Sequence, residues 1–385
     1  MQGHSSRGHE ARVDESPREN VPGASRACRD MTTIGEDLQM RKAPLATAIL
    51  AATGMTAATA VSADELFIYN WTNYTSPEVI EKFEEETGIS VTLDVYTSNE
   101  DLMARLIAGD TGFDIALPSD SYVERMLEED MLYAFDATSL ENFPNVMAPH
   151  DSPYFDEERM YSAPYMWGTT GIGYRTDVVD EELEHSWAEI FDPRDEFKGE
   201  IGMLNEVSDA VNAAKFYLGL EPCSEDPEDW QQVQDLMLEQ RQHVKTYNAT
   251  GTDESLVSGE ILIHQMWNGA AHRAWRDDKN ISYLYPEEGT VFWSDNMVIP
   301  KGANNKENAK KFINFMMSQE AAAMTSNFTG YASAIRDTEP YLDDELAESP
   351  AVNVPEEFAD RLVSIASCSE RSDELRDRVW TRILQ

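Results

Sequence analysis

Short apolar segments alternate with amphipathic ones along residues 66–128, and this alternation limits the chain to few fold classes. The apolar segments have the β-branched or alternating pattern of strands, and the amphipathic segments have the spacing of helices. Ser76, Asn99 and Ser119 stand where the three helices should begin, and such side chains cap helix N-termini. Strands separated by helices form parallel sheets that helices cover, so an α/β fold is predicted. The expected strands are residues 66–69, 89–96 and 113–117.

The same alternation returns after an interruption at residues 164–171. A length of 385 residues suggests two domains, but no internal repeat and no low-complexity linker separates the two stretches. Two α/β lobes that share strands at their junction would need no linker, and a cleft between them is a natural ligand site. Here we expect strands at 201–204, 261–267 and 290–299, and helices at about 208–219, 225–241 and 309–317.

Acidic residues outnumber basic ones by 72 to 30, which gives a formal net charge of −42. Residues 1–63 carry seven of each sign, so the rest of the chain holds the whole excess, with 65 acidic and 23 basic residues. So strong a negative charge argues against a nucleic-acid partner and against docking on anionic lipid. The basic residues are 20 Arg and only 10 Lys, a balance that favours adaptation to high salt over a merely acidic protein.

Residues 40–63 have the order of a secretory signal peptide. Arg41 and Lys42 form the charged start, a weakly apolar stretch follows, and Val61-Ser62-Ala63 is a small-residue cleavage site. A membrane anchor is disfavoured because the stretch is rich in Ala and Thr rather than Leu. Cleavage would make Asp64 the first mature residue and deliver the protein to a Gram-negative periplasm. Residues 1–39 lack hydrophobic periodicity, and we interpret them as a segment upstream of the true start.

Two cysteines, Cys223 and Cys368, lie beyond the predicted signal, and an oxidising compartment would allow them to pair. Two cysteines alone do not establish proximity, so the pairing stays open. The sequence has no clustered histidines, no C-x-x-C and no nucleotide-binding glycine loop. We therefore expect neither a metal nor a cofactor.

Polar and aromatic residues gather where the predicted strands end. Trp293 and Asp295 lie within one strand, and its two-residue period places them on the same face. Asp is depleted in strands, yet a carboxylate beside an indole suits a cation with an aliphatic stem. The carboxylate binds the ammonium group, and the ring covers the methylenes and adds cation–π attraction. Similar segments are Asn70-Trp71-Thr72-Asn73-Tyr74, Pro118-Ser119-Asp120-Ser121-Tyr122 and Trp267-Asn268-Gly269.

In these segments the chain resembles the spermidine- and putrescine-binding periplasmic proteins of bacterial ABC transporters. The resemblance runs from about Glu65 to the C-terminus and rests on the order of short motifs, none of them decisive alone. They include FIYNWTNY, FDIALPS, PYMWGTTGIGY, the WNG of residues 267–269 and the FWSD of residues 292–295.

The resemblance implies a two-lobed, type II-like periplasmic binding protein that closes on its ligand. The first lobe would comprise residues 64–168 and 294–338, and the second lobe residues 171–290 and 345–385. It also implies a monomer that passes putrescine or spermidine to an inner-membrane ABC permease.

The same resemblance carries the family's ligand contacts onto ten residues. Asp295 would bind an ammonium group with Ser119 near it, and Glu206 and Asp209 would be carboxylate partners on the second lobe. Glu206 and Asp209 could equally serve a helix N-terminus. Trp267, which could also be a core residue, and Trp293 would enclose the methylene chain. The remaining contacts would be Trp71, Thr72 and Tyr74 on the first lobe and Tyr331, which would close one side.

Three positions depart from the family pattern. Asn73 is neutral where relatives usually have an acid, and Ser121 stands where some relatives have an aromatic residue. Ala270 follows the WNG motif where putrescine-selective relatives tend to have Asp. Other features are divided between the putrescine and spermidine branches, so the sequence leaves the choice of polyamine open.

Other function classes fit the sequence less well. An enzyme acting on amines would need a nucleophile, a cofactor lysine or a metal, and the sequence marks none. A ferric-ion protein would need paired tyrosines with His or carboxylates, and an anion-binding protein would need arginines or open helix N-termini. Binding of a different small cationic amine, or a role as part of a ligand-sensing receptor, stays an alternative.

We expect the melting temperature of the mature protein to rise from low to molar salt, because 65 acidic residues against 23 basic ones repel each other when screening is weak. Ligand affinity should fall over the same range, since salt also screens the attraction between a polycation and an acidic cleft. Scanning fluorimetry across the salt series measures the first effect. A melting temperature that does not change with salt would contradict the high-salt adaptation.

Overall fold

A computed structural model describes residues 64–385 except 110–111, 180–181 and 350. The predicted upstream segment and signal peptide lie outside the described residues. In the described part, the strands join in one mixed sheet of order β2-β1-β3-β9-β4-β7-β5-β6, with β8 and β10 paired to β4 and β11 to β9. The strands are β1 (Glu65–Trp71), β2 (Ser90–Tyr96), β3 (Ile115–Ala116), β4 (Ser162–Arg175), β5 (Ile201–Met203), β6 (Val244–Tyr247), β7 (Ile263–Trp267), β8 (Ile281–Leu284), β9 (Thr290–Val298), β10 (Ala332–Ser333) and β11 (Leu362–Val363).

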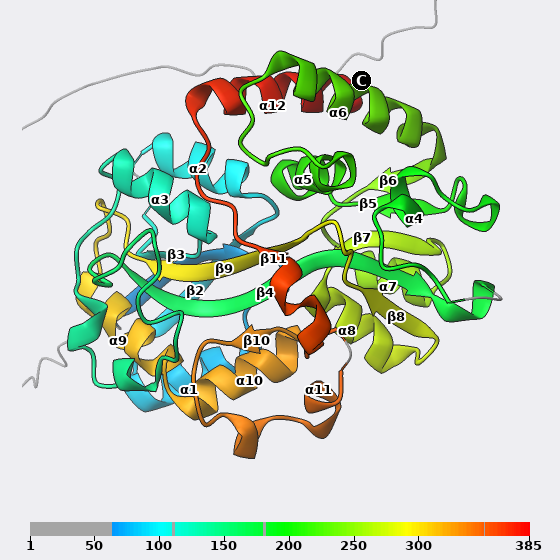
Figure 1. Ribbon diagram of the computed structural model, residues 1–385. Helices are drawn as coiled ribbons and strands as arrows, with labels where there is room; N and C mark the ends of the chain where they lie inside the picture. The colour runs from blue at the N-terminus through cyan, green and yellow to red at the C-terminus, as the bar shows by residue number, and fades with distance from the viewer. Residues whose placement is uncertain (1–63, 110–111, 180–181, 350) are drawn as a thin grey trace, which may run out of the picture. The chain divides into compact units, whose positions relative to one another are not determined.

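Helices flank this sheet on both sides (Figure 1). Of the helices in the described part, none combines the length and the hydrophobicity that crossing a bilayer requires. The helices are α1 (Pro77–Thr87), α2 (Asn99–Ile107), α3 (Asp120–Glu128), α4 (Ala188–Phe191), α5 (Val207–Leu218), α6 (Pro227–Gln240), α7 (Thr252–Val257), α8 (Asn268–Asp277), α9 (Lys306–Met316), α10 (Gln319–Thr329), α11 (Asp344–Ala347) and α12 (Glu370–Ile383).

The first part of the sheet follows the predicted alternation. Strand β1 pairs in parallel with β2 and β3. Leu66 and Ile68 of β1 belong to a core with α1, α9 and α10, whereas Tyr69 packs with α2 and α3. The two-residue period of a strand explains this division, because successive side chains point to opposite faces.

The other part of the sheet is built in the same way. Strand β5 pairs in parallel with β6 and β7. Ile201 and Ile263 pack in a core with α5, α6 and α12, whereas Met266 and Ile281 pack with α7 and α8 on the opposite face. The chain therefore has separate apolar cores in its two halves, as a two-lobed fold requires.

The prediction of a purely parallel sheet is wrong at its centre. Strand β4 pairs antiparallel with both β7 and β9, and Figure 1 shows β4 and β9 as long ribbons across the sheet. The interruption at residues 164–171 is the middle of β4, where nearly every side chain is buried. A strand buried on both faces has a continuous rather than an alternating apolar pattern, so its sequence resembles neither a half-buried strand nor a helix.

Strands β4 and β9 also bring together the two expected lobe junctions. Thr169 pairs with Phe292, and Thr170 pairs with Val291. Strands that run from one half of the chain into the other need no linker between the halves. The lobe boundaries themselves stay a prediction.

Two of the three predicted helix starts are confirmed. Ser76 and Ser119 are the N-cap residues of α1 and α3. The prediction for Asn99 is wrong by one residue, since Ser98 caps α2 and its Oγ accepts a hydrogen bond from the Asp101 N–H at 3.1 Å. Asn99 instead donates from Nδ2 to Ser119 Oγ at 3.1 Å.

The structure pairs Cys223 with Cys368, which the sequence left open. Their Cα atoms are 5.2 Å apart, and 145 residues separate them along the chain. The bond joins the loop after α5 to the segment before α12. Closing so long a loop restricts the unfolded chain, an effect that typically stabilises a protein by about 2–4 kcal/mol.

Candidate functional site

A cavity of about 990 Å³, counting solvent at its mouth, lies where several strands end. Its walls come from the segments after the carboxyl ends of β1, β3, β5 and β7, and from the middle of β9. This is where open α/β sheets bind ligands. All ten residues singled out from the sequence line it, and their contacts with a ligand stay a prediction. They are Trp71, Thr72, Tyr74, Ser119, Glu206, Asp209, Trp267, Trp293, Asp295 and Tyr331.

Aromatic rings form much of the wall. The ring of Trp71 meets that of Trp267 edge to face at 5.8 Å between centroids, and Trp293 meets Tyr331 in the same way at 5.2 Å. The ring centroids of Tyr74 and Tyr331 are 5.3 Å apart. Trp293 packs against the cores of both halves of the chain. The rings therefore offer apolar faces that a methylene chain could cover.

Two glycines allow this close packing of rings. A Cβ atom on Gly168 would lie 2.6 Å from Cζ2 of Trp293, and one on Gly269 would lie 2.4 Å from Cε1 of Tyr331. Contacts this short do not occur in proteins, so any larger residue would displace the ring. These glycines therefore fix where Trp293 and Tyr331 stand.

Asp295 is the carboxyl residue of β9. It is 4% exposed, and Oδ1 accepts a hydrogen bond from Ser119 Oγ at 2.8 Å. Ser119 is itself held by Asn99. Burial raises the pKa of Asp295 to about 7, although the hydroxyls of Ser119 and Tyr74 act in the opposite direction. The cost of an unneutralised charge in this place is therefore substantial.

A second acidic group is formed by Glu206 and Asp209. Glu206 caps α5, as the helix-terminus alternative foresaw, because its Oε2 accepts a hydrogen bond from the Asp209 N–H at 2.9 Å. Its other oxygen, Oε1, is buried and has no hydrogen-bond partner among the residues that the structure describes. Asp209 accepts hydrogen bonds from Trp267 Nε1 at 2.8 Å and from Thr170 Oγ1 at 2.9 Å. The cap thus accounts for one oxygen of Glu206 and leaves the other unexplained.

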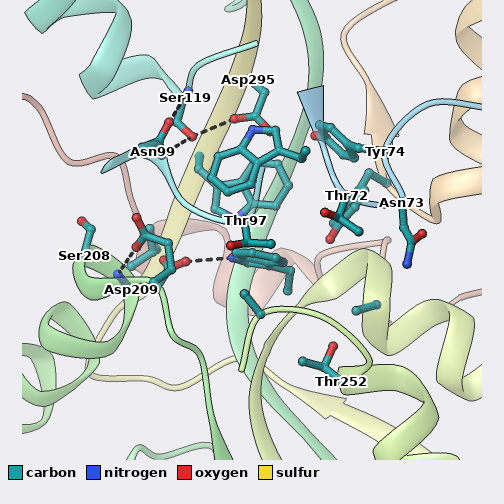
Figure 2. A pocket seen from close by; sticks show the side chains of 18 of the residues that line it. Thr72, Asn73, Tyr74, Thr97, Asn99, Ser119, Ser208, Asp209, Thr252 and Asp295 are labelled. Carbon is teal, nitrogen blue, oxygen red and sulfur yellow. Dashed lines mark hydrogen bonds between the residues drawn. The ribbon is translucent and has the colours of Figure 1, made fainter. Parts of the chain in front are cut away.

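Burial governs the protonation of this group as well. It raises the pKa of Asp209 to about 6 and that of Glu206 well above its ordinary value. The negative charges of Glu100 and Asp209 raise the pKa of Glu206 further. Figure 2 shows Asp209 and Asp295 apart from each other, with aromatic side chains drawn between them.

Asp120 lies in the segment Pro118–Tyr122 that the sequence singled out, but it was not among the ten expected ligand contacts. Its buried carboxyl group accepts hydrogen bonds from the Ser121 N–H at 2.9 Å and from Ser364 Oγ at 3.1 Å, and burial raises its pKa to about 7. An acid in the first turn of a helix is ordinary, so its position gave no signal. Its partner Ser364 is 244 residues away in sequence.

The charges of the cavity favour a cation. Five carboxyl groups line it, and in the described part of the chain Arg273 is the one basic side chain among the lining residues. Arg273 pairs with Asp253 at 2.7 Å. The carboxyl groups that remain are Asp120, Glu206, Asp209 and Asp295. Acids beside aromatic rings, without a protein cation to pair them, suit an amine with an aliphatic body.

The sequence matches known solute-binding proteins over most of its length. The family model of the bacterial extracellular solute-binding proteins matches residues 78–354. A spermidine/putrescine-binding periplasmic protein of Salmonella typhimurium is 32% identical over 302 residues, which is 78% of this chain and 86% of that protein. A putrescine-binding periplasmic protein of Escherichia coli is 31% identical over 340 residues, covering 83% of this chain and 90% of the other.

A solved structure is similar over nearly its whole length. It is described as a putative spermidine/putrescine ABC transporter from Listeria monocytogenes, and it is 29% identical with a TM-score of 0.79. The match covers 84% of this chain and 99% of that one. The predicted two-lobed α/β fold class is thereby confirmed.

We expect Asp295→Asn to stabilise the ligand-free protein strongly at pH 8 and clearly less at pH 5. The folded state holds the Asp295 proton more tightly than the unfolded state does, so this group's contribution to stability is present at low pH and is lost as pH rises from about 4 to about 7. Asparagine mimics the protonated form at every pH. The gain at pH 8 should be at least about 1 kcal/mol in free energy of unfolding.

Urea unfolding at the two pH values measures this difference. Asp235→Asn, at an exposed position on α6, is the matched control and should show no such dependence on pH. Equal stability of wild type and Asp295→Asn at pH 8 would show that burial does not disfavour the Asp295 carboxylate.

Proposed function

This chain belongs to the bacterial extracellular solute-binding protein family, and on that basis we propose that it captures polyamines such as putrescine and spermidine and delivers them to an ABC permease. The observation that carries the proposal is the set of buried carboxyl groups beside aromatic rings that have no basic partner among the lining residues the structure describes. The names of its relatives support the same ligand class. The proposal includes no chemical step.

In this proposal the two acidic groups hold the two ends of the ligand. Asp295 loses its proton and binds one ammonium group, while Ser119 Oγ donates a hydrogen bond to its Oδ1 atom. The unpartnered Oε1 of Glu206, together with Asp209, binds another. Trp267 and Trp293 contribute ring faces to the methylenes between them.

The energies of these contacts suffice for tight binding. Four buried methylenes contribute about 3 kcal/mol, and each charged hydrogen-bonded end adds about 1.5–3 kcal/mol. Offset against the cost of association, this reaches micromolar affinity, which corresponds to about −8 kcal/mol.

The site of action follows from the predicted leader. We propose that the protein is exported, cleaved after Ala63 and active in the periplasm as a monomer. N-terminal sequencing of exported protein should begin at Asp64, and a retained leader would contradict the cleavage.

We expect Asp295→Asn to weaken binding of putrescine and spermidine by about 2–5 kcal/mol, because it removes the charge opposite a buried ammonium group. Trp293→Leu should cost about 1–2 kcal/mol of packing and cation–π attraction. Because both side chains contact the same part of the ligand, the double variant should lose less than the sum. Titration calorimetry on the wild type and the three variants gives these values.

The control for charge alone is Asp235→Asn, which lies on the exposed face of α6 and should bind as the wild type does. Unchanged affinity in a folded Asp295→Asn protein would remove Asp295 from the site. A different result would overturn the proposed function itself. In scanning fluorimetry against small amines and anions, neither amine would raise the melting temperature of the wild type and an anion would.

A further inference from the structure

The segment between β11 and α12 contacts both halves of the chain. This segment, the strap, comprises residues 364–369, and in Figure 1 it leads from β11 past α3 to α12. Ile365 of the strap lines the ligand cavity and also a smaller hollow beside it. The strap is therefore part of the cavity wall rather than a connection on the outside of the fold.

Three contacts fasten the strap to the second half of the chain, which contains β5, β6 and β7. Cys368 forms the disulfide bond with Cys223 in the loop after α5. Ser369 Oγ donates a hydrogen bond to Glu225 Oε1 at 2.7 Å. Ile365 packs against the apolar core that α5, α6 and α12 share. Because α12 continues directly from the strap and belongs to the same core, the strap should move with this half.

Two hydrogen bonds join the strap to α3, which belongs to the first half of the chain. The backbone N–H of Ser367 donates to Oε2 of Glu124 at 2.7 Å, and Ser364 Oγ donates to Oδ2 of Asp120 at 3.1 Å. Helix α3 packs with β1 and β2 in an apolar core separate from that of α12. These two bonds therefore cross from one half of the chain to the other.

The bond from Ser367 to Glu124 is the shorter of the two. It joins an N–H to a carboxylate, and such charge-assisted bonds are stronger than neutral ones. Without the carboxylate, the N–H of Ser367 would lose this partner while still packed against α3, which costs free energy. A nearby ion pair between Arg125 and Asp373 is 3.7 Å long and has side chains 39% and 23% exposed, so it contributes little.

We propose that the strap is a latch that slows release of the ligand, with Glu124 as its positioning residue on α3. This inference rests on the proposed function. Two-lobed binding proteins enclose and release their ligands by movement of one lobe against the other. An opening movement would separate α3 from the strap and break the bonds at Glu124 and Asp120, so these bonds stabilise the arrangement that encloses the ligand. In the open protein water binds the same groups, so the latch leaves ligand entry nearly unchanged.

Stopped-flow fluorescence with putrescine and with spermidine measures the rate constants of association and dissociation, and Trp71, Trp267 and Trp293 in the cavity wall are its reporters. We expect Glu124→Ala to raise the dissociation rate constant about tenfold and to change the association rate constant less than about twofold. Glu124→Gln keeps an oxygen that can accept the Ser367 N–H, so its rate constants should stay within about threefold of the wild type.

Two further variants complete the test. Glu128→Ala, at an exposed position of the same helix, controls for the loss of one acidic charge and should release the ligand as the wild type does. Ser364→Ala removes the other bond from an exposed strap residue, so it tests the latch even if Glu124→Ala does not fold. It should raise the dissociation rate constant about threefold or more. Melting temperatures of the ligand-free proteins establish that each variant is folded.

Two results would overturn the latch while leaving the proposed function intact. One is a folded Glu124→Ala protein that melts at a lower temperature but releases both amines as slowly as the wild type, since this is what a purely structural role of Glu124 predicts. The other is a loss of affinity that arises wholly from slower association. A wild type that binds neither amine would overturn the proposed function, and the latch with it.

Discussion

Asp295 is a carboxyl group that the fold buries without a protein cation beside it, and the organisation of the cavity depends on this. Transfer of a lone carboxylate out of water is costly, so a buried acid keeps its proton or acquires a partner. Ser119 Oγ donates one hydrogen bond to Asp295 at 2.8 Å. In the described part of the chain, the one basic residue that lines the cavity is Arg273, and it is already paired with Asp253. The group is therefore stable when protonated and ready for a cation that comes from outside.

The central strands make this arrangement possible. Strand β9 carries both Trp293 and Asp295 and pairs with β4 across the expected lobe junctions. Because Trp293 packs against one apolar core of each half, its ring lies where the two halves of the chain meet. Gly168 on β4 gives that ring its space. A movement of one half against the other would therefore displace the Trp293 ring in the cavity wall.

Much of the fold and of the cavity lining could be predicted from the sequence, for two different reasons. The outer strands and helices follow from hydrophobic period and capping residues, as at Ser76 and Ser119. The ten lining residues followed from resemblance of short motifs, since chemistry alone favoured only Trp293 and Asp295. Strand β4 was missed because burial on both faces removes the alternating pattern. Arg273 and Asp120 were not among the expected contacts because their partners, Asp253 and Ser364, are brought to them by tertiary folding.

If the ligand is a cationic amine, its binding converts the protonated acids of the cavity to carboxylates. Calorimetry of putrescine binding at pH 6.5, in buffers of different ionisation enthalpy, counts the protons exchanged. With the pKa of Asp295 at about 7 and that of Asp209 at about 6 in the ligand-free protein, binding should release protons to the buffer, and less at pH 8. Binding at pH 6.5 with no proton release, or with proton uptake, would contradict the account.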